Sequence, residues 1–204
     1  MLLLEQKRFA YLMKHQDFLL NHIRKFDSLS TEEEQLLISK MRYKILDKRD
    51  FLLQEGQVCS SYYFVLSGCL RLYKIVDTGF EQILQFGIPG WWLSDYQSFD
   101  SQKVSEYYIQ TVEKTEVFVL NRNDAHELFY SIPGFNNYFR LMMQKAYTAA
   151  LKKSEIMLCE SAQDRYTQFT TDFPDFVRLI PQYMLASFLG FTPQFLSGLR
   201  AKKR

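Results

Sequence analysis

The chain has 204 residues, of which 47% are hydrophobic and 16% aromatic. A chain of this length can bury one large or two modest cores, and this composition excludes an intrinsically disordered protein. The formal net charge is +2, which by itself neither indicates nor excludes a nucleic-acid partner.

The cysteines and histidines do not indicate a metal or redox site. The three cysteines include no CxxC pair and are too few for a disulfide framework, and the three histidines do not cluster with them. The apolar start at Met1–Leu4 is followed at once by Glu5, so it is too short for a signal peptide or a membrane span. We therefore expect a cytoplasmic protein without a metal, a cofactor or a membrane contact.

The N-terminal part of the chain has helical patterning. Residues 5–26 carry apolar side chains at helical spacing. Ser30 and Glu33 form an S-x-x-E capping box, which predicts a second helix that runs to about Met41.

The pattern then changes to short strands rich in aromatic and branched residues, separated by turns that contain glycine. Many short strands at this spacing indicate an antiparallel sandwich or jelly roll, so the fold class is α+β. The predicted strands cover residues 43–47, 51–54, 62–66, 69–76, 80–86, 105–112 and 116–120.

Helical periodicity returns with a short helix over 122–130 and a long one over 135–160. Apolar and small side chains in the long helix alternate at three- and four-residue steps, which favours a two-stranded coiled coil and a homodimer. The alternative is that the same stripe packs on the chain's own sheet. The predicted seam consists of Phe139, Met142, Ala146, Ala149, Lys153 and Ile156.

The C-terminal part reads as a helix over 162–172, a turn near Asp175 and two short helices over 181–189 and 193–202. Pro181 suits the first turn of its helix. Gly190 can end that helix in the left-handed conformation, and Thr192 can cap the next one. Two short helices joined in this way predict a helix-turn-helix.

In a helix-turn-helix the second helix enters the major groove of double-stranded DNA, and its N-terminal residues meet base edges. The side chains that face away from the core are suited to this task, and the basic end of the chain adds attraction to phosphates. The candidate DNA-binding residues are Thr192, Gln194, Phe195, Ser197, Gly198, Arg200, Lys202 and Lys203.

This order of elements resembles the Crp/Fnr family of bacterial transcription regulators, from about Phe26 to the C-terminus. The run Tyr62–Gly68 and the Pro89-Gly90 turn match the glycine-punctuated barrel of that family, and the run Ala186–Pro193 looks like its subgroup with short C-termini. The resemblance implies a sensor domain over residues 1–133, a connecting and dimerisation helix over 134–160 and a DNA-binding domain over 161–204. It also implies DNA and a second copy as partners, with RNA polymerase and an unidentified effector as further candidates.

Two departures from the family pattern concern its ligand and its DNA contacts. Members that bind cyclic AMP carry a Gly-Glu pair and an Arg-Ser pair; here Ser94-Asp95 stands at the first, and the Lys103–Glu106 stretch supplies no arginine at the second. We therefore expect no binding of cyclic AMP. Gly198 replaces an arginine that related recognition helices use, which predicts altered or weakened DNA binding.

The barrel can still hold a small molecule, and a set of aromatic and polar residues could line such a site. The alternative is that these side chains are simply core. The candidate pocket consists of Trp92, Ser94, Asp95, Tyr96, Ser105 and Tyr107.

Three functions remain in competition. The first is a dimeric regulator that reads a short inverted repeat. The second is a ligand-binding or protein-interaction module with a weakened, non-specific helix-turn-helix. The third, an enzyme on a jelly-roll scaffold, is disfavoured, because residues 43–120 contain no histidine for a metal cluster and the chain shows no nucleophile motif.

Overall fold

The computed structural model describes the backbone of residues 2–202 and the side chains of residues 13–201. Eight strands form two four-stranded antiparallel sheets, with the orders β1-β8-β3-β6 and β2-β7-β4-β5. The strands are β1 (Arg42–Leu46), β2 (Phe51–Leu53), β3 (Ser61–Ser67), β4 (Leu70–Ile75), β5 (Glu81–Gly87), β6 (Trp92–Leu93), β7 (Tyr108–Thr111) and β8 (Thr115–Asn121).

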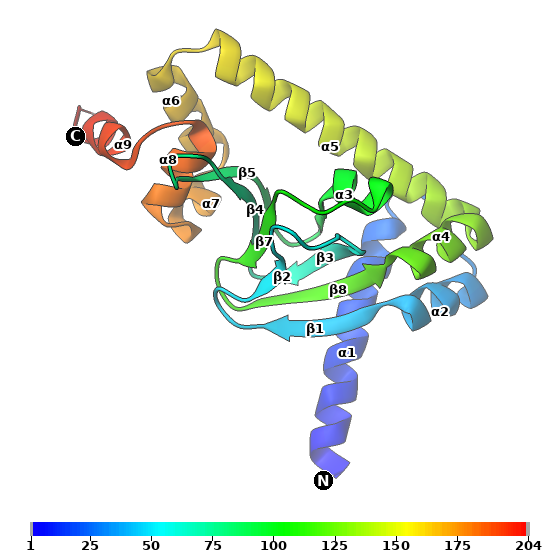
Figure 1. The fold of residues 1–204 in the computed structure, drawn as a ribbon. Coiled ribbons are helices and arrows are strands. Elements are labelled where there is room, and N and C mark those ends of the chain that lie inside the picture. Colours follow the sequence, from blue (N-terminus) through cyan, green and yellow to red (C-terminus); the bar gives the residue numbers. More distant parts are fainter. Residues whose placement is uncertain (1, 203–204) are drawn as a thin grey trace.

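Most of the helices come from the two ends of the chain and lie outside the barrel (Figure 1). One group, α1 to α5, lies on the barrel or runs away from it, and α6 to α9 form a compact unit at the far end of the long helix α5. The helices are α1 (Leu2–Ile23), α2 (Thr31–Lys40), α3 (Tyr96–Ser101), α4 (Arg122–Ser131), α5 (Pro133–Cys159), α6 (Ala162–Asp172), α7 (Pro174–Leu179), α8 (Gln182–Leu189) and α9 (Pro193–Lys202).

The predicted α+β jelly roll with a long helix and a helical C-terminal part is confirmed. Every predicted strand is present within a few residues, and the Ser30–Glu33 capping box starts α2 as expected. Three elements were missed: β6, α3 and α7. In the region of α7 only a turn was expected. Pro181 is also the N-cap of α8 rather than part of its first turn, because its ψ of 141° is not helical.

The main core lies between the sheets and extends to α1, α4 and the first turns of α5. Tyr138 of α5 is fully buried, and its hydroxyl accepts a hydrogen bond from Nε1 of Trp92 at 3.0 Å. The same hydroxyl lies 2.8 Å from Nδ1 of His22, so one side chain joins α1, β6 and α5. Burial of these aromatic residues stabilises this part of the core.

A second core joins the C-terminal helices to the outer face of the barrel. Leu185 of α8 packs in one cluster with Ile83 and Phe86 of β5. Since β5 is an edge strand, its outer backbone groups need partners. Ser187 supplies them: its hydroxyl accepts from the N–H of Ile83 at 2.7 Å and donates to the carbonyl of Glu81 at 2.6 Å.

Helix α5 also takes part in this junction. Lys153 donates to the carbonyl of Leu84 at 2.9 Å, and its ammonium lies 3.7 Å from the centre of the Phe188 ring. Burial lowers the pKa of Lys153 to about 8. The barrel, the long helix and the helical unit thus meet around β5.

Candidate functional site

The two last helices form the predicted helix-turn-helix. Gly190 ends α8 in the left-handed conformation, with φ of 74°, and a non-glycine residue there would be strained. Phe191 fills the turn: it is buried, and its N–H donates to the carbonyl of Ala186 at 2.8 Å. The hydroxyl of Thr192 accepts from the N–H of Phe195 at 3.2 Å and so caps α9.

The structure separates the inner from the outer residues of α9. Leu196 and Leu199 are buried against α8, as the sequence predicts. The remaining described candidate residues are exposed, and the side chain of Lys202 and all of Lys203 lie outside the described residues. The exposed candidates are Thr192, Gln194, Phe195, Ser197, Gly198 and Arg200.

Two of these exposed residues also line a groove beside α9. Ser197 and Arg200 line an open groove of about 560 Å³ between α9 and Tyr166 of α6. Gln194, Phe195 and Gly198 do not line this groove. The exposed residues of α9 therefore include the groove-lining Ser197 and Arg200 and a second set that lies outside the groove.

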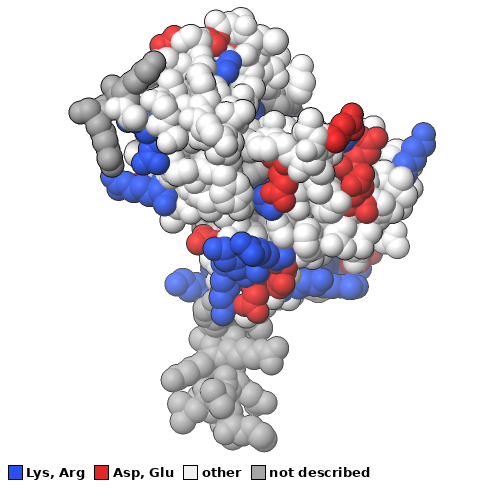
Figure 2. Space-filling model, turned by 60° about the vertical axis from the view of Figure 1, so that its left-hand side comes forward, with Lys and Arg blue, Asp and Glu red and all other residues white. Residues whose placement is uncertain are grey.

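Few charged side chains lie on the described part of α9. The described part of α9 contains Arg200 and no acidic residue. On the face shown in Figure 2, Lys and Arg gather mainly in a patch close to where α1 leaves the body, with acidic side chains beside it. Among the described residues on that face, the Lys and Arg side chains therefore form separate groups.

Arg165 ties the end of the long helix to the helix-turn-helix. Its Nη1 donates to the carbonyls of Met157 at 3.0 Å and of the C-cap Glu160 at 3.3 Å, at the C-terminal end of α5, where carbonyls have no partner within the helix. Its guanidinium also lies 5.1 Å from the centre of the Phe191 ring. The role of this residue as a link between α5 and the helix-turn-helix was not predicted from the sequence.

The residues of the candidate pocket are engaged by other groups of the barrel. Asp95 is buried and caps α3, where its Oδ1 accepts from the N–H of Ser98 at 3.1 Å. Its Oδ2 accepts from the hydroxyl of Ser105 at 2.6 Å. The two stretches in which the family has its Gly-Glu and Arg-Ser pairs thus meet, and an internal carboxylate lies between them.

The other residues of the candidate pocket are also engaged within the barrel. The Ser94 hydroxyl donates to the carbonyl of Ser61 at 2.9 Å, and the Tyr107 N–H donates to Ser105 at 2.9 Å. The Trp92 ring packs 5.4 Å from that of Phe139, centre to centre. The ring of Tyr96 lies 5.7 Å from that of Tyr62, and burial raises the pKa of Tyr96 above its usual range. These contacts favour the interpretation of the set as core.

The predicted dimer seam of α5 fits the structure only in part. Phe139 is buried in the barrel core, and Lys153 contacts β5 and Phe188, so these two residues cannot face a partner helix. Met142 also packs partly on the core, Ala146 and Ile156 are half-buried and Ala149 is exposed. A three-four spacing alone could not tell which face of the helix meets its own barrel.

A different stripe of α5 faces outward. Tyr147, Leu151 and Leu158 have exposed fractions of 70%, 58% and 86%. With the exposed Ser154, they follow steps of four, three and four residues. This is the spacing of a coiled-coil seam.

The described residues contain no group of three or more His, Cys, Asp or Glu side chains placed to hold a metal ion. Among the described helices, none combines the length and the apolar composition that a membrane span requires.

Comparison with known proteins agrees with this architecture. Residues 43–131 match the family model of the cyclic nucleotide-binding domain. The c-di-GMP-responsive global regulator CLP of Xanthomonas campestris has a similar structure, with a TM-score of 0.70 and 15% identity over 85% of this chain and 91% of that one. A Crp/Fnr-family regulator of Eubacterium rectale matches with a TM-score of 0.67 and 16% identity, over 85% of this chain and 83% of that one.

Residues 43–131 are thus similar to a cyclic nucleotide-binding domain, and the chain has the fold seen in Crp/Fnr regulators. A relative in sequence is the transcriptional activator protein Anr of Pseudomonas aeruginosa, 25% identical over 130 residues, which are 63% of this chain and 52% of Anr. The chain thus matches about half the length of this curated relative. The resemblance to the Crp/Fnr family is confirmed.

Proposed function

We propose that the protein is a DNA-binding transcription regulator of the Crp/Fnr type that acts as a homodimer and does not respond to cyclic AMP. The proposal rests on one arrangement. Helices α8 and α9, joined by a turn at Gly190, expose the outer face of α9 to solvent. Arg165 links this helix pair to the long helix α5, which has an exposed apolar stripe. Two copies joined along such helices would present two recognition helices to an inverted repeat. RNA polymerase is the expected further partner of a regulator bound to DNA.

The loss of cyclic AMP binding is inferred from Asp95. A cyclic phosphate needs cationic or backbone donors. At the N-terminus of α3, the carboxylate of Asp95 already takes the N–H of Ser98 and the hydroxyl of Ser105. A negative ligand placed there would meet this carboxylate. The effector, where one exists, is thus expected to have other chemistry or another site.

The experiment is the selection of bound fragments from a random DNA library by the purified protein, at about 50 mM and about 200 mM salt. Enrichment of an inverted repeat at both salt concentrations is the expected result. Binding without a motif, lost at the higher salt, would contradict the proposal.

The second candidate function, a module with a weakened helix-turn-helix, rests on Gly198. A Cβ added at this position meets no atom within 4 Å, so a side chain can begin here without a steric clash. We expect the Gly198→Arg variant to gain DNA affinity, by about 1–3 kcal/mol where the new side chain reads guanine. Lack of sequence-specific binding by both the wild type and this variant would favour the second function.

A further inference from the structure

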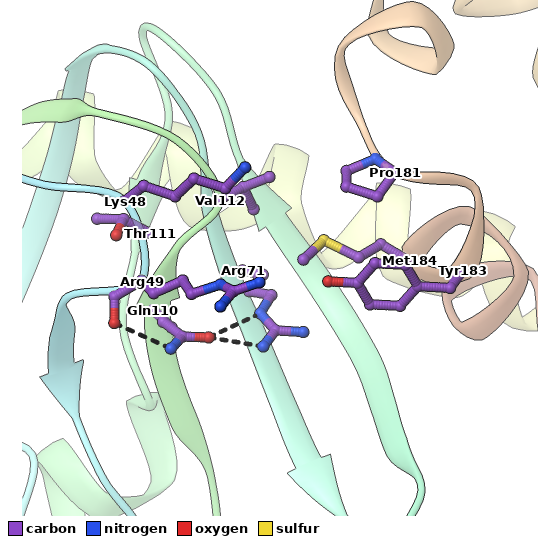
Figure 3. A pocket seen from close by; sticks show the side chains of 9 residues that line it. All are labelled: Lys48, Arg49, Arg71, Gln110, Thr111, Val112, Pro181, Tyr183 and Met184. Carbon is purple, nitrogen blue, oxygen red and sulfur yellow. Dashed lines mark hydrogen bonds between the residues drawn. The ribbon is translucent and has the colours of Figure 1, made fainter.

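A small cavity of about 170 Å³ lies at the junction between the barrel and the helix-turn-helix (Figure 3). One wall comes from the β1–β2 turn and from β4 and β7, and the opposite wall comes from the start of α8. Three of its lining residues are cations, Lys48, Arg49 and Arg71, and none is acidic. The cavity is separate from the residues around Asp95 that correspond to the family's ligand site.

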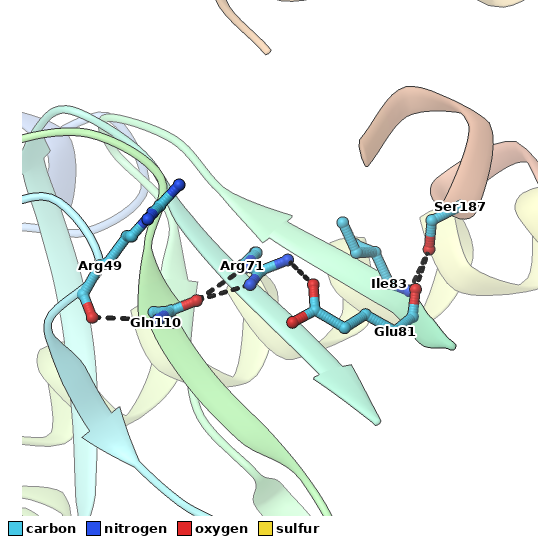
Figure 4. Close-up of polar contacts among 6 residues, drawn as sticks. All are labelled: Arg49, Arg71, Glu81, Ile83, Gln110 and Ser187. Atoms are coloured by element: carbon cyan, nitrogen blue, oxygen red, sulfur yellow. Dashed lines mark hydrogen bonds and ion pairs between the residues drawn. The ribbon is translucent and has the colours of Figure 1, made fainter. Parts of the chain in front are cut away.

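The cation at the base of the cavity is fixed in place (Figure 4). Arg71 is 5% exposed, and its Nε and Nη2 donate to Oε1 of Gln110 at 3.1 and 2.6 Å. Its Nη1 pairs with Glu81 at 2.5 Å. Since a guanidinium has five N–H donors, this arrangement leaves two for a further acceptor.

The other two cations have no charged partner. Among the described residues, neither the Lys48 ammonium nor the Arg49 guanidinium makes an ion pair. The neighbouring carboxylate of Asp50 is used within the turn, where it accepts from the N–H of Asp47 at 2.8 Å. Neither Asp47 nor Asp50 lines the cavity.

Hydrogen bonds hold the turn that carries Arg49 against β7, and Arg49 has an unfavourable backbone conformation there. Arg49 has φ of 73°, in the left-handed region that glycine usually occupies. Its N–H donates to the carbonyl of Thr111 at 3.1 Å, and its carbonyl accepts from Nε2 of Gln110 at 3.0 Å. Gln110 therefore links Arg49 and Arg71, and an arginine in this unusual conformation is consistent with a binding role.

We propose that this cavity binds a small dianion of the phosphate class. Two exposed cations that pair with no carboxylate of the described residues, next to a buried guanidinium with two N–H groups left over, match a doubly charged oxyanion. The volume is smaller than that of typical pockets for drug-sized ligands, which hold about 300–1,000 Å³, so a cyclic nucleotide does not fit.

The ligand would also hold the helix-turn-helix on the barrel. Pro181, Tyr183 and Met184 line the cavity from the α8 side, so the site is complete only while α8 lies against β5. Arg71 is connected to the same contact, because its partner Glu81 accepts a hydrogen bond from Ser187. A ligand with higher affinity for the docked arrangement increases its population. The binding site itself does not depend on the proposed DNA-binding function.

The test is calorimetric titration of the full chain with inorganic phosphate, against sodium chloride of equal ionic strength, together with hydrogen exchange at the Ile83 amide. The variants are Lys48→Ala/Arg49→Ala and, as the charge-matched control, the exposed pair Lys25→Ala/Lys103→Ala. We expect saturable binding of phosphate by the wild type and the control, at least tenfold weaker binding by Lys48→Ala/Arg49→Ala, and slower exchange at Ile83 with phosphate. Tyr183→Ala tests the α8 wall without a change of charge and should also weaken binding.

Equal binding by all variants, or no saturation in the wild type, would overturn the proposal. Tighter binding of malonate than of phosphate would overturn the phosphate class. Because no DNA is present, a failure here is distinct from a failure of the proposed function.

Discussion

The hydroxyl of Ser105 donates a hydrogen bond to Oδ2 of Asp95 at 2.6 Å, and both side chains are buried. Asp95 ends the stretch after β6, and Ser105 lies beyond α3, so this bond closes the segment that contains α3. In this barrel, a side chain of the protein thus supplies the anion at the N-terminus of α3.

The first prediction concerns this carboxylate. Asp95→Ala removes the cap of α3 and the acceptor of Ser105, and we expect it to lower the free energy of unfolding by about 1–3 kcal/mol. Chemical denaturation with urea measures the change. Asp100→Ala, an exposed substitution in the same helix, is the control and should stay within about 0.5 kcal/mol of the wild type. An equal effect of the two substitutions would contradict the role of Asp95.

The second prediction concerns the contact between α8 and β5. Ser187→Ala leaves the buried N–H of Ile83 without its acceptor, so we expect a loss of about 1–3 kcal/mol and faster hydrogen exchange at Ile83. Exchange measured by NMR resolves this amide. Ser154→Ala, on the exposed face of α5, should leave it unchanged. Unchanged exchange in Ser187→Ala would mean that α8 is not docked in solution.

The third prediction concerns the exposed stripe of α5. Leu151→Glu puts a charge at the centre of the proposed seam, and we expect the dimer to dissociate, because a buried unpaired charge is strongly unfavourable in an interface. Analytical ultracentrifugation across a concentration series measures the change. Thr148→Glu introduces the same charge off the stripe and should remain dimeric. Dimers in both variants would place the interface elsewhere.

The fourth prediction is a pH dependence. The pKa of Lys153 is about 8 in the folded chain, below its ordinary value of 10.5, because burial disfavours the charged form. The unfolded chain therefore binds more protons between these values, and this lysine makes stability rise with pH across that range. The unfolding free energy of the wild type, minus that of Lys153→Met, should increase from about pH 7.5 to about pH 10. The exposed Lys152→Met is the control; a flat difference for Lys153 would contradict its burial.

Much of the fold follows from local signals in the sequence. The runs of aromatic and branched residues in β3 and β8 and the capping box of α2 are local patterns, and the structure has them where they were expected. The elements that were missed are short: β6 has two residues and α3 six. Hydrophobic periodicity cannot develop over such lengths, and the cap at Asp95 was the only local signal of α3.

The sites could be predicted only where they lie on one continuous segment. The helix-turn-helix was found because Gly190 and Thr192 lie close together in the sequence. The cavity at the junction is lined by residues from distant segments of the chain, such as Lys48, Arg71 and Met184. A sequence motif therefore cannot predict it. The predicted seam of α5 includes Phe139 and Lys153, which contact the chain's own barrel and β5, because tertiary packing decides which side of a helix meets the barrel. The dimer interface itself stays a prediction.

The docking of α8 on β5 has a further consequence for the released form of the protein. Ser187 and Lys153 cover the outer N–H and carbonyl groups of an edge strand, at Ile83, Glu81 and Leu84. Release of α8 from β5 would make these groups available to any other strand. Uncovered edges of this kind promote aggregation and strand exchange between molecules. The open conformation is therefore expected to be short-lived in solution unless a binding partner captures it.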